Sequence, residues 1–262
     1  MSTDSETVQV LGPDGPDLPV VESGGSARAL VWPGNGARLR SMHLISLEPG
    51  GRTRPQRHDT EAVYYVIEGG GRVGKDEPLK EGSMIHVAAG AEYVLKAGAD
   101  GMQLVGGPSP PDASLYENGG SEMAGGAAGE AQSGAVRTFH RDRPGVMLPM
   151  IASDARLVIW LGVGAREANM NYVSMQPGEE NVPHAHLDSE DTIYIISGRG
   201  TVEDLTHGLS LEFEAGQAIQ VPPGVQHRVK ADRGSAVVSV GGPCPADERM
   251  LRAAGVHPDD AA

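Results

Sequence analysis

The amino-acid sequence repeats itself, and this internal repeat constrains the fold more than any other feature. The only two tryptophans, Trp32 and Trp160, lie 128 residues apart. The residues that match at this offset are Ala27-Arg28 with Ala155-Arg156, Gly34 with Gly162, Gly36-Ala37-Arg38 with Gly164-Ala165-Arg166, and Met42 with Met170. Further along, Val105-Gly-Gly-Pro108 and Asp112 recur 135 residues later as Val240-Gly-Gly-Pro243 and Asp247. Repetition at a nearly fixed offset predicts two copies of one structural unit.

Short extended segments separated by turn residues fill each copy. They include residues 42–47 and 63–67 in the first copy, and 171–175 and 192–196 in the second. Runs of this length that are rich in β-branched residues are typical of strands, and 37 glycines with 19 prolines supply many tight turns. Because aromatic residues make up only 4% of the chain, the core must consist mainly of aliphatic side chains. The sequence therefore predicts a β-barrel or β-sandwich in each copy.

A group of potential metal ligands stands in the second copy. His184 and His186 are separated by one residue, so an extended backbone places both imidazoles on the same face. Asp191 follows within five residues, and His227 comes after a Pro-Pro-Gly turn. Imidazole suits Fe, Zn, Ni and Cu, and a carboxylate widens the choice toward Mn. These four residues are the predicted metal ligands and catalytic centre.

The two segments that carry these residues resemble the two characteristic motifs of the cupin superfamily. The first motif is Gly, five residues, His-x-His, three or four residues, an acid, six residues and Gly; the second is Gly, five residues, Pro-x-Gly, two residues and His. The residues in register are Gly178, His184, His186, Gly198, Gly216, Pro222, Gly224 and His227. The acid of the family is usually Glu, whereas the spacing to Gly198 selects Asp191 here; Glu190, one residue earlier and on the opposite face, is the alternative.

The resemblance implies an all-β chain, a bicupin with two tandem jelly-roll barrels and a short C-terminal helix. We expect an N-terminal arm over residues 1–26 that could add an edge strand, and a first barrel over residues 27–115. A flexible linker rich in Gly, Ala and Ser is expected over residues 116–140, and the metal-binding barrel over residues 141–262. The short helix is predicted from Asp247 to Ala254, where Gly255 ends it.

The first copy lacks most of the ligands. The positions of His184, His186, Asp191 and His227 are held there by Gln56, His58, Ala62 and Tyr93, and Glu61 matches Glu190. One histidine with a glutamine and a tyrosine is a poor divalent site, so we expect a metal-free barrel that serves as scaffold or dimer surface. The alternative is a second small-molecule pocket, in which Arg52, Arg54, Arg57 and His58 hold an anion. We favour arginines that are solvated on a loop.

The composition of the chain limits its expected binding partners and its expected cellular compartment. The formal net charge of −14 argues against nonspecific binding to nucleic acid or to anionic membranes. The single cysteine, Cys244, allows no intramolecular disulfide and suits a reducing compartment. No apolar run approaches the ~20 residues needed to span a bilayer, and the acidic N-terminal residues do not resemble a signal peptide. We therefore expect a cytoplasmic protein that acts on a small molecule; a homodimer is an expectation from the resemblance alone.

Four protein ligands on a six-coordinate ion leave two positions for a substrate, or for a substrate and dioxygen. The resemblance implies three functions. The first is an Fe(II)-dependent dioxygenase that acts on a small enol, diol or carboxylate. The second is a non-redox enzyme that uses Mn(II), Zn(II) or Ni(II): an isomerase, a lyase, a decarboxylase or a C–N hydrolase similar to the ureidoglycine aminohydrolases. The third is a non-catalytic metal or ligand binder. Because no acid/base residue can be placed beside the ligands, we favour the dioxygenase and Fe(II).

Overall fold

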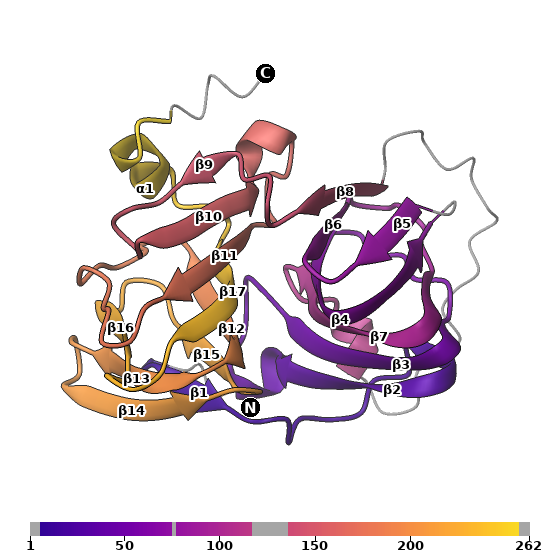
Figure 1. The fold of residues 1–262 in the computed structure, drawn as a ribbon, viewed down its shortest axis with the longest axis horizontal. Helices are drawn as coiled ribbons and strands as arrows, with labels where there is room; N and C mark the ends of the chain where they lie inside the picture. Colours follow the sequence, from indigo (N-terminus) through magenta and orange to yellow (C-terminus); the bar gives the residue numbers. More distant parts are fainter. Residues whose placement is uncertain (1–5, 75–76, 117–135, 257–262) are drawn as a thin grey trace.

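Two β-barrels lie side by side in the computed structural model, which describes residues 6–74, 77–116 and 136–256 (Figure 1). One short helix, α1 (Glu248–Ala253), follows the last strand, and the Asp247 carboxylate caps it by accepting hydrogen bonds from two backbone N–H groups. The predicted all-β fold class, two tandem jelly-roll barrels with a short C-terminal helix, is confirmed. No helix in the described part of the chain is long and apolar enough to cross a lipid bilayer.

The first barrel consists of one sheet in the order β2-β3-β7-β4-β6-β8, with β5 paired to β4. Its strands are β2 (Val21–Val31), β3 (Met42–Thr53), β4 (Glu61–Val73), β5 (Glu77–Lys80), β6 (Ser83–Val87), β7 (Leu95–Ser109) and β8 (Val136–His140). The second barrel has a seven-stranded sheet, β1-β15-β12-β17-β11-β10-β9, and a three-stranded sheet, β14-β13-β16. Its strands are β1 (Gln9–Leu11), β9 (Val146–Met147), β10 (Asp154–Ile159), β11 (Met170–Met175), β12 (Glu190–Ser197), β13 (Arg199–Asp204), β14 (Leu209–Glu214), β15 (Ala218–Val221), β16 (His227–Ala231) and β17 (Val237–Cys244).

The strand registers show that the two sequence copies fold alike. In each barrel a glycine of the central strand faces one residue on either neighbouring strand, and the residues involved occupy matching places in the repeat. The equivalent trios are His43, Gly106 and Tyr64 in the first barrel, and Asn171, Gly241 and Ile193 in the second. Positions in the two barrels can therefore be compared side chain by side chain.

The repeated tryptophans have a shared packing role. Trp32 precedes the 3-10 turn η1 (Pro33–Asn35), and Trp160 precedes η3 (Leu161–Val163). A Cβ atom added to Gly34 would lie 2.2 Å from the Trp32 ring, and one added to Gly162 would lie 2.2 Å from the Trp160 ring. The repeated Trp-x-Gly group thus lets each indole fold over the turn that follows it, and neither tryptophan is among the residues that surround the predicted ligands.

The barrels are joined through an apolar interface and two matching carboxylate contacts. Buried side chains of both barrels form one cluster, which includes Val63, Tyr65 and Tyr194. At its edge Glu61 accepts hydrogen bonds from the backbone N–H groups of residues 166–168 (2.9–3.1 Å). In the same way, Glu190 accepts hydrogen bonds from the backbone N–H groups of residues 38 and 39 of the first barrel (2.9 and 2.7 Å). Burial alone would raise the pKa of Glu61, but the contact with His86 and these backbone donors lower it to about 2.

Each barrel also includes a strand from outside the residue range that the sequence assigned to it. β1, within the predicted N-terminal arm, pairs with β15 of the second barrel at the edge of its sheet. β8 pairs with β6 of the first barrel, although the sequence assigned residues 136–140 to a flexible linker. All five residues of β8 are partly buried, and Phe139 packs against the apolar cluster between the barrels. Residues 117–135 of the predicted linker lie outside the described residues.

Candidate metal centre

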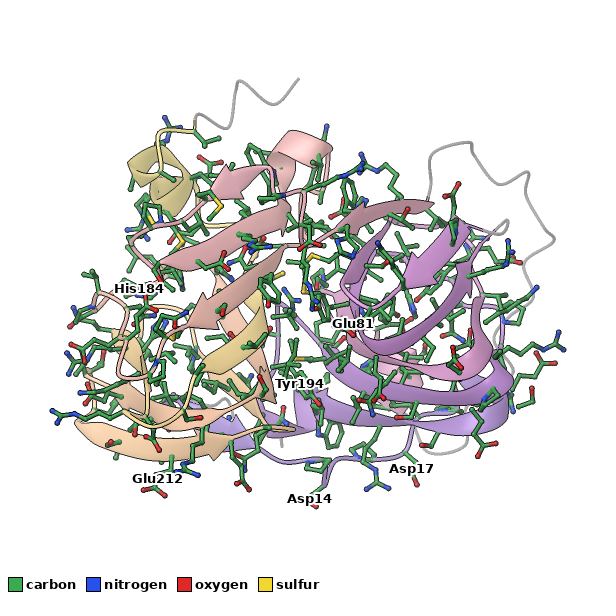
Figure 2. The ribbon with its side chains drawn as sticks, in the orientation of Figure 1. Asp14, Asp17, Glu81, His184, Tyr194 and Glu212 are labelled. Atoms are coloured by element: carbon green, nitrogen blue, oxygen red, sulfur yellow. The ribbon has the colours of Figure 1, made fainter. Side chains whose placement is uncertain are left out.

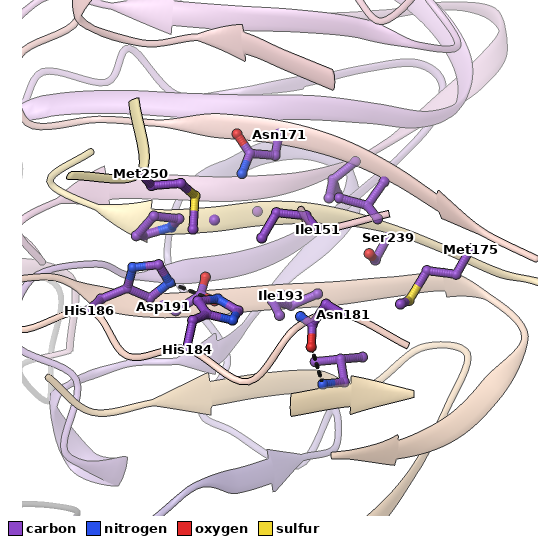
Figure 3. Close-up of a pocket in the computed structure, with 16 residues that line it drawn as sticks. Ile151, Asn171, Met175, Asn181, His184, His186, Asp191, Ile193, Ser239 and Met250 are labelled. Atoms are coloured by element: carbon purple, nitrogen blue, oxygen red, sulfur yellow. Dashed lines mark hydrogen bonds and ion pairs between the residues drawn. The ribbon is translucent and has the colours of Figure 1, made fainter. Parts of the chain in front are cut away.

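The structure brings the four predicted ligands together in the second barrel. His184 and His186 lie between β11 and β12, Asp191 is the second residue of β12, and His227 begins β16. Figure 2 labels His184 in the second barrel, and Figure 3 shows His184, His186 and Asp191 close together. Each residue offers one nitrogen or oxygen atom, and these four atoms all lie within 4.8 Å of one another. Opposite ligands of a single ion with bonds of about 2.1 Å are separated by about 4.2 Å, so a small inward movement suffices to coordinate one ion.

Backbone hydrogen bonds fix the segments that carry the histidines. His184 and His227 form an antiparallel bridge, with N–H to carbonyl distances of 3.1 and 2.8 Å in the two directions. The N–H of Gly224 donates to the carbonyl of His186 at 2.7 Å, and this turn requires a positive φ of 81° at Gly224, which favours glycine. The Pro-Pro-Gly turn therefore places His227 and holds the backbone of His186 at the same time.

Each imidazole is oriented by a hydrogen bond from its Nδ1. His184 and His227 donate to the backbone carbonyl two residues earlier in the chain, at 2.9 and 3.1 Å. His186 donates instead to the carboxylate of Asp247, at 2.9 Å. With the proton held on Nδ1, the Nε2 lone pair of each ring is left available to a metal ion.

Several atoms at the centre of this group are buried without a hydrogen-bond partner among the described residues. They are Nε2 of His186, Nε2 of His227 and Oδ1 of Asp191. The other carboxylate oxygen of Asp191 lies 3.7 Å from the first of these nitrogens and 3.5 Å from the second, too far for a hydrogen bond. Unpaired buried acceptors are costly, and a cation among them removes the cost. Three imidazoles and one carboxylate fit a divalent transition-metal ion.

The charges of the predicted ligands and of Asp247 shift one another's pKa values. Burial and the neighbouring histidines lower the pKa of His184 to about 4. Burial opposes the charge on His186, but the carboxylates of Asp191 and Asp247 outweigh it and raise its pKa to about 9. Burial also opposes the charge on Asp191, yet the imidazoles hold its pKa well below the ordinary value. The Asp191 carboxylate is thus charged at neutral pH. Its charge is balanced either by a protonated His186 or by a metal ion.

The side chain of Glu190, the other candidate acid, points away from the histidines. Glu190 and Asp191 are consecutive in β12, so their side chains lie on opposite faces of the sheet. Asp191 faces the histidines, whereas Glu190 is bound to residues 38 and 39 of the first barrel and accepts a hydrogen bond from Gln220. Of the two candidate acids, the structure places Asp191 among the predicted ligands.

A cavity opens beside the ligands (Figure 3). His184, His186 and Asp191 form part of its wall. The rest of the wall has apolar side chains, such as Ile151 and Ile193, and a few uncharged polar groups. Among the apolar residues of β12 and β15, Ile193 lines the cavity, whereas Ile195, Ile219 and Val221 belong to the barrel core.

In the first barrel, tyrosines fill the equivalent space. Gln56 and Tyr93 form the same antiparallel bridge as His184 and His227 do. The Tyr93 hydroxyl contacts Nε2 of His58 at 3.1 Å and the hydroxyl of Tyr64 at 2.6 Å. These groups are buried and satisfy one another, which leaves no donor set for an ion.

The arginines of the first barrel lie away from this network. Arg52, Arg54 and Arg57 are exposed, and Arg52 forms an ion pair with Glu22 at 2.7 Å. His58 is buried and donates its Nδ1 proton to Asp112 at 2.8 Å. The geometry therefore favours solvated arginines over the alternative of a second anion pocket.

Asp247 contacts a predicted metal ligand and was not among the residues that the sequence assigned to the site. It holds His186, and its other carboxylate oxygen accepts hydrogen bonds from the first turn of α1. Asp112 makes the equivalent contacts to His58 and to the backbone N–H of Ser114 in the first barrel. The signal was present in the repeat, because the two aspartates match at the same offset as the Val-Gly-Gly-Pro group before them.

We expect Asp247→Asn to weaken metal binding by about 10- to 100-fold while the fold is retained, because asparagine still caps the helix but removes the charge that holds His186. Competition titration with a chelating dye would measure the affinity. The matched control is Asp112→Asn, which alters the equivalent hydrogen bond in a barrel without ligands and should leave metal affinity unchanged. Equal affinity losses in both variants would show an indirect effect on stability instead.

Comparison with known proteins agrees with this geometry. Residues 171–240 match the family model described as the cupin domain. A variant of the oxalate decarboxylase of Bacillus subtilis superposes with a TM-score of 0.70 at 16% sequence identity, covering 94% of this chain and 79% of that one. The oxalate decarboxylase of Lactobacillus farciminis in its formate complex also gives 0.70 at 16% identity, covering 100% of this chain and 97% of the other. No curated protein sequence shows a significant match.

At this level of identity the solved structures establish the fold alone. The family model covers the chain from β11 to β17. All four predicted ligands, from His184 to His227, fall inside the matched range. Residues 171–240 are therefore similar to the cupin domain, and the chain as a whole has the jelly-roll fold of the structures that it resembles.

Proposed function

We propose that this chain is a bicupin enzyme that holds one divalent metal ion in its second barrel and acts there on a small polar molecule. The observation that carries the proposal is the set of unpaired buried atoms on His186, Asp191 and His227, which converge beside a cavity. The first barrel acts as a scaffold, because hydrogen-bonded tyrosines occupy its equivalent site.

The wall of the cavity favours chemistry at the metal. Apart from the ligands, it contains no lysine, arginine, glutamate, tyrosine or cysteine among the described residues. The chain therefore offers no separate general acid or base at the place where a substrate would bind. A bound ion would supply Lewis acidity and, in the case of iron, a site for dioxygen. These features support an Fe(II)-dependent dioxygenase as the first candidate.

A non-redox lyase that uses Mn(II) is the second candidate. Its support is the fold likeness to oxalate decarboxylase, because one of the similar Bacillus subtilis structures is described by its Mn(II) centres (TM-score 0.70, 17% identity). The ligand set of three imidazoles and one carboxylate suits Mn(II) as well as Fe(II). The two candidates share the metal centre and differ in the ion and in the need for oxygen.

Metal analysis combined with oxygen consumption distinguishes them. The protein is purified without chelators or added metal, and its metal content is measured by mass spectrometry. For the dioxygenase we expect iron as the bound metal, and oxygen uptake on addition of small enols or hydroxy acids under air. Bound manganese with turnover that needs no oxygen would favour the lyase. A protein that takes up no divalent metal even on reconstitution would refute both candidates.

A further inference from the structure

The side-chain carbonyl oxygen of Asn171 is buried without a hydrogen-bond partner among the described residues. The residue lies on β11 with only 6% of its surface exposed, and its Oδ1 has no hydrogen-bond partner among the described residues. Asn171 and the metal ligands line the same cavity (Figure 3). A buried amide that lacks partners costs free energy, so a polar group in the cavity is needed to satisfy it.

The sheet around Asn171 keeps this amide accessible from the cavity. Gly241 and Gly242, on the neighbouring strand β17, also line the cavity and present no side chain there. A Cβ atom added at Gly242 would lie 2.6 Å from Nδ2 of Asn171. The glycine at position 242 therefore leaves room for the side chain of Asn171.

The first barrel shows how the same position is satisfied when no ligand is needed. His43 occupies the place of Asn171 in the sheet register, and its Nε2 contacts the hydroxyl of Tyr116 at 2.6 Å. Tyr116 stands four residues after Asp112, and the residue four positions after Asp247 is Leu251, which has no polar group. The second barrel thus has a polar side chain on the wall, and no residue in the described part of the chain pairs with its Oδ1.

The charges around the cavity limit what it accepts. Two carboxylates, Asp191 and Asp247, contact the imidazole of His186, and together they balance the charge of a divalent ion. The wall of this cavity carries no lysine or arginine among the described residues. Arg249 lines the adjoining pocket on the outer side of His184 and His186, where it is exposed and lies 3.7 Å from the carboxylate of Asp247. A second negative charge on a bound molecule would therefore lie in a low-dielectric space without a counter-ion, which is unfavourable.

We infer that the site takes a small monoanion that chelates the metal through two oxygens and whose uncharged body carries a hydrogen-bonding group held by Asn171. This inference rests on the proposed metal centre and adds the class of substrate to it. Asn171 is then a specificity-determining residue, since a carboxamide offers both a donor and an acceptor to a neutral polar group.

Two probes of nearly the same shape test the inference. 2-Hydroxysuccinamate and 2-hydroxysuccinate share a hydroxy acid head, but the far end of the first is an amide and that of the second is a carboxylate. Their binding to the Mn(II)-loaded protein is measured by calorimetry, with the Mn(II) electron paramagnetic resonance spectrum as an independent readout. We expect the amide to bind about tenfold more tightly than the dianion, and Asn171→Leu to weaken the amide by about tenfold.

Controls separate this result from a general loss of the site. Asn171→Leu should keep its full Mn(II) content, and its affinity for 2-hydroxypentanoate, which has an apolar body, should not fall. Asn171→Ala serves as a second variant if leucine disturbs the fold. In a protein that binds Mn(II), equal affinities for the two probes, no binding of either, or an unchanged amide affinity in both variants would overturn the inference alone. Failure to bind Mn(II) would overturn the proposed function as well.

Discussion

Replacing His227 with alanine should leave the protein without bound metal. The ring supplies one of four donors, and its Nε2 is buried without a partner among the described residues. Removing a residue that hydrogen-bonds to a metal ligand typically lowers metal affinity by about 10- to 100-fold. We expect removal of the ligand His227 itself to lower metal affinity by more than about 100-fold. Metal content after gel filtration, together with the shift of the thermal midpoint on adding Mn(II) or Fe(II), would measure the effect.

The first barrel offers matched controls for this experiment. Gln56→Ala and Tyr93→Phe alter the residues that form the same backbone bridge in the barrel without ligands. Both variants should bind metal as the native protein does, and Tyr93→Phe should not change turnover if the first barrel is a scaffold. Full metal content in His227→Ala would refute the assignment of the centre.

The adjacent acids Asp191 and Glu190 should give opposite results when each is replaced with alanine. Asp191→Ala should strongly weaken metal binding, because it removes the only anionic donor of the set. Glu190→Ala should retain metal but lower the free energy of unfolding, on the order of 3 kcal/mol, because two backbone N–H groups at residues 38 and 39 lose their acceptor. Metal titration and denaturant unfolding of both variants would measure the two effects.

The ranking of the two variants is decisive. If Glu190→Ala lost metal while Asp191→Ala kept it, the acid of the site would have been assigned to the wrong residue. Glu61→Ala provides the control for stability, because Glu61 makes the corresponding contacts to residues 166–168 and lies in the barrel without ligands. It should lower stability by a similar amount and leave metal affinity unchanged.

The parts of this molecule that the sequence allows one to predict depend on local backbone requirements. The spacing around His184 and the Pro-Pro-Gly224 turn is set by the geometry of one hairpin and one bridge, so it leaves a regular pattern in the chain. The internal repeat gave the number of barrels, since equivalent positions lie opposite the equivalent glycines Gly106 and Gly241. Period-two alternation in β12 explains why Asp191 rather than Glu190 meets the histidines.

The parts that were not predicted depend on contacts between distant segments. Asp247 lies far along the chain from His186, and its hydrogen bond depends on how α1 packs against the barrel. The role of Glu190 emerges only when the other barrel is present, because its partners belong to that barrel. Likewise, whether tyrosines such as Tyr93 fill a cavity or line it depends on packing in three dimensions rather than on spacing.

The exchange of edge strands has a consequence for any attempt to divide the chain. A cut before β8 would leave β1 on the fragment without its partner strand β15, and β8 on the fragment without its partner strand β6. Each fragment would expose an unpaired sheet edge, which invites aggregation. Mixed together, the two fragments would have complementary edges and two reciprocal carboxylate contacts to guide reassembly. Each barrel therefore depends on a strand of the other fragment to complete its sheet.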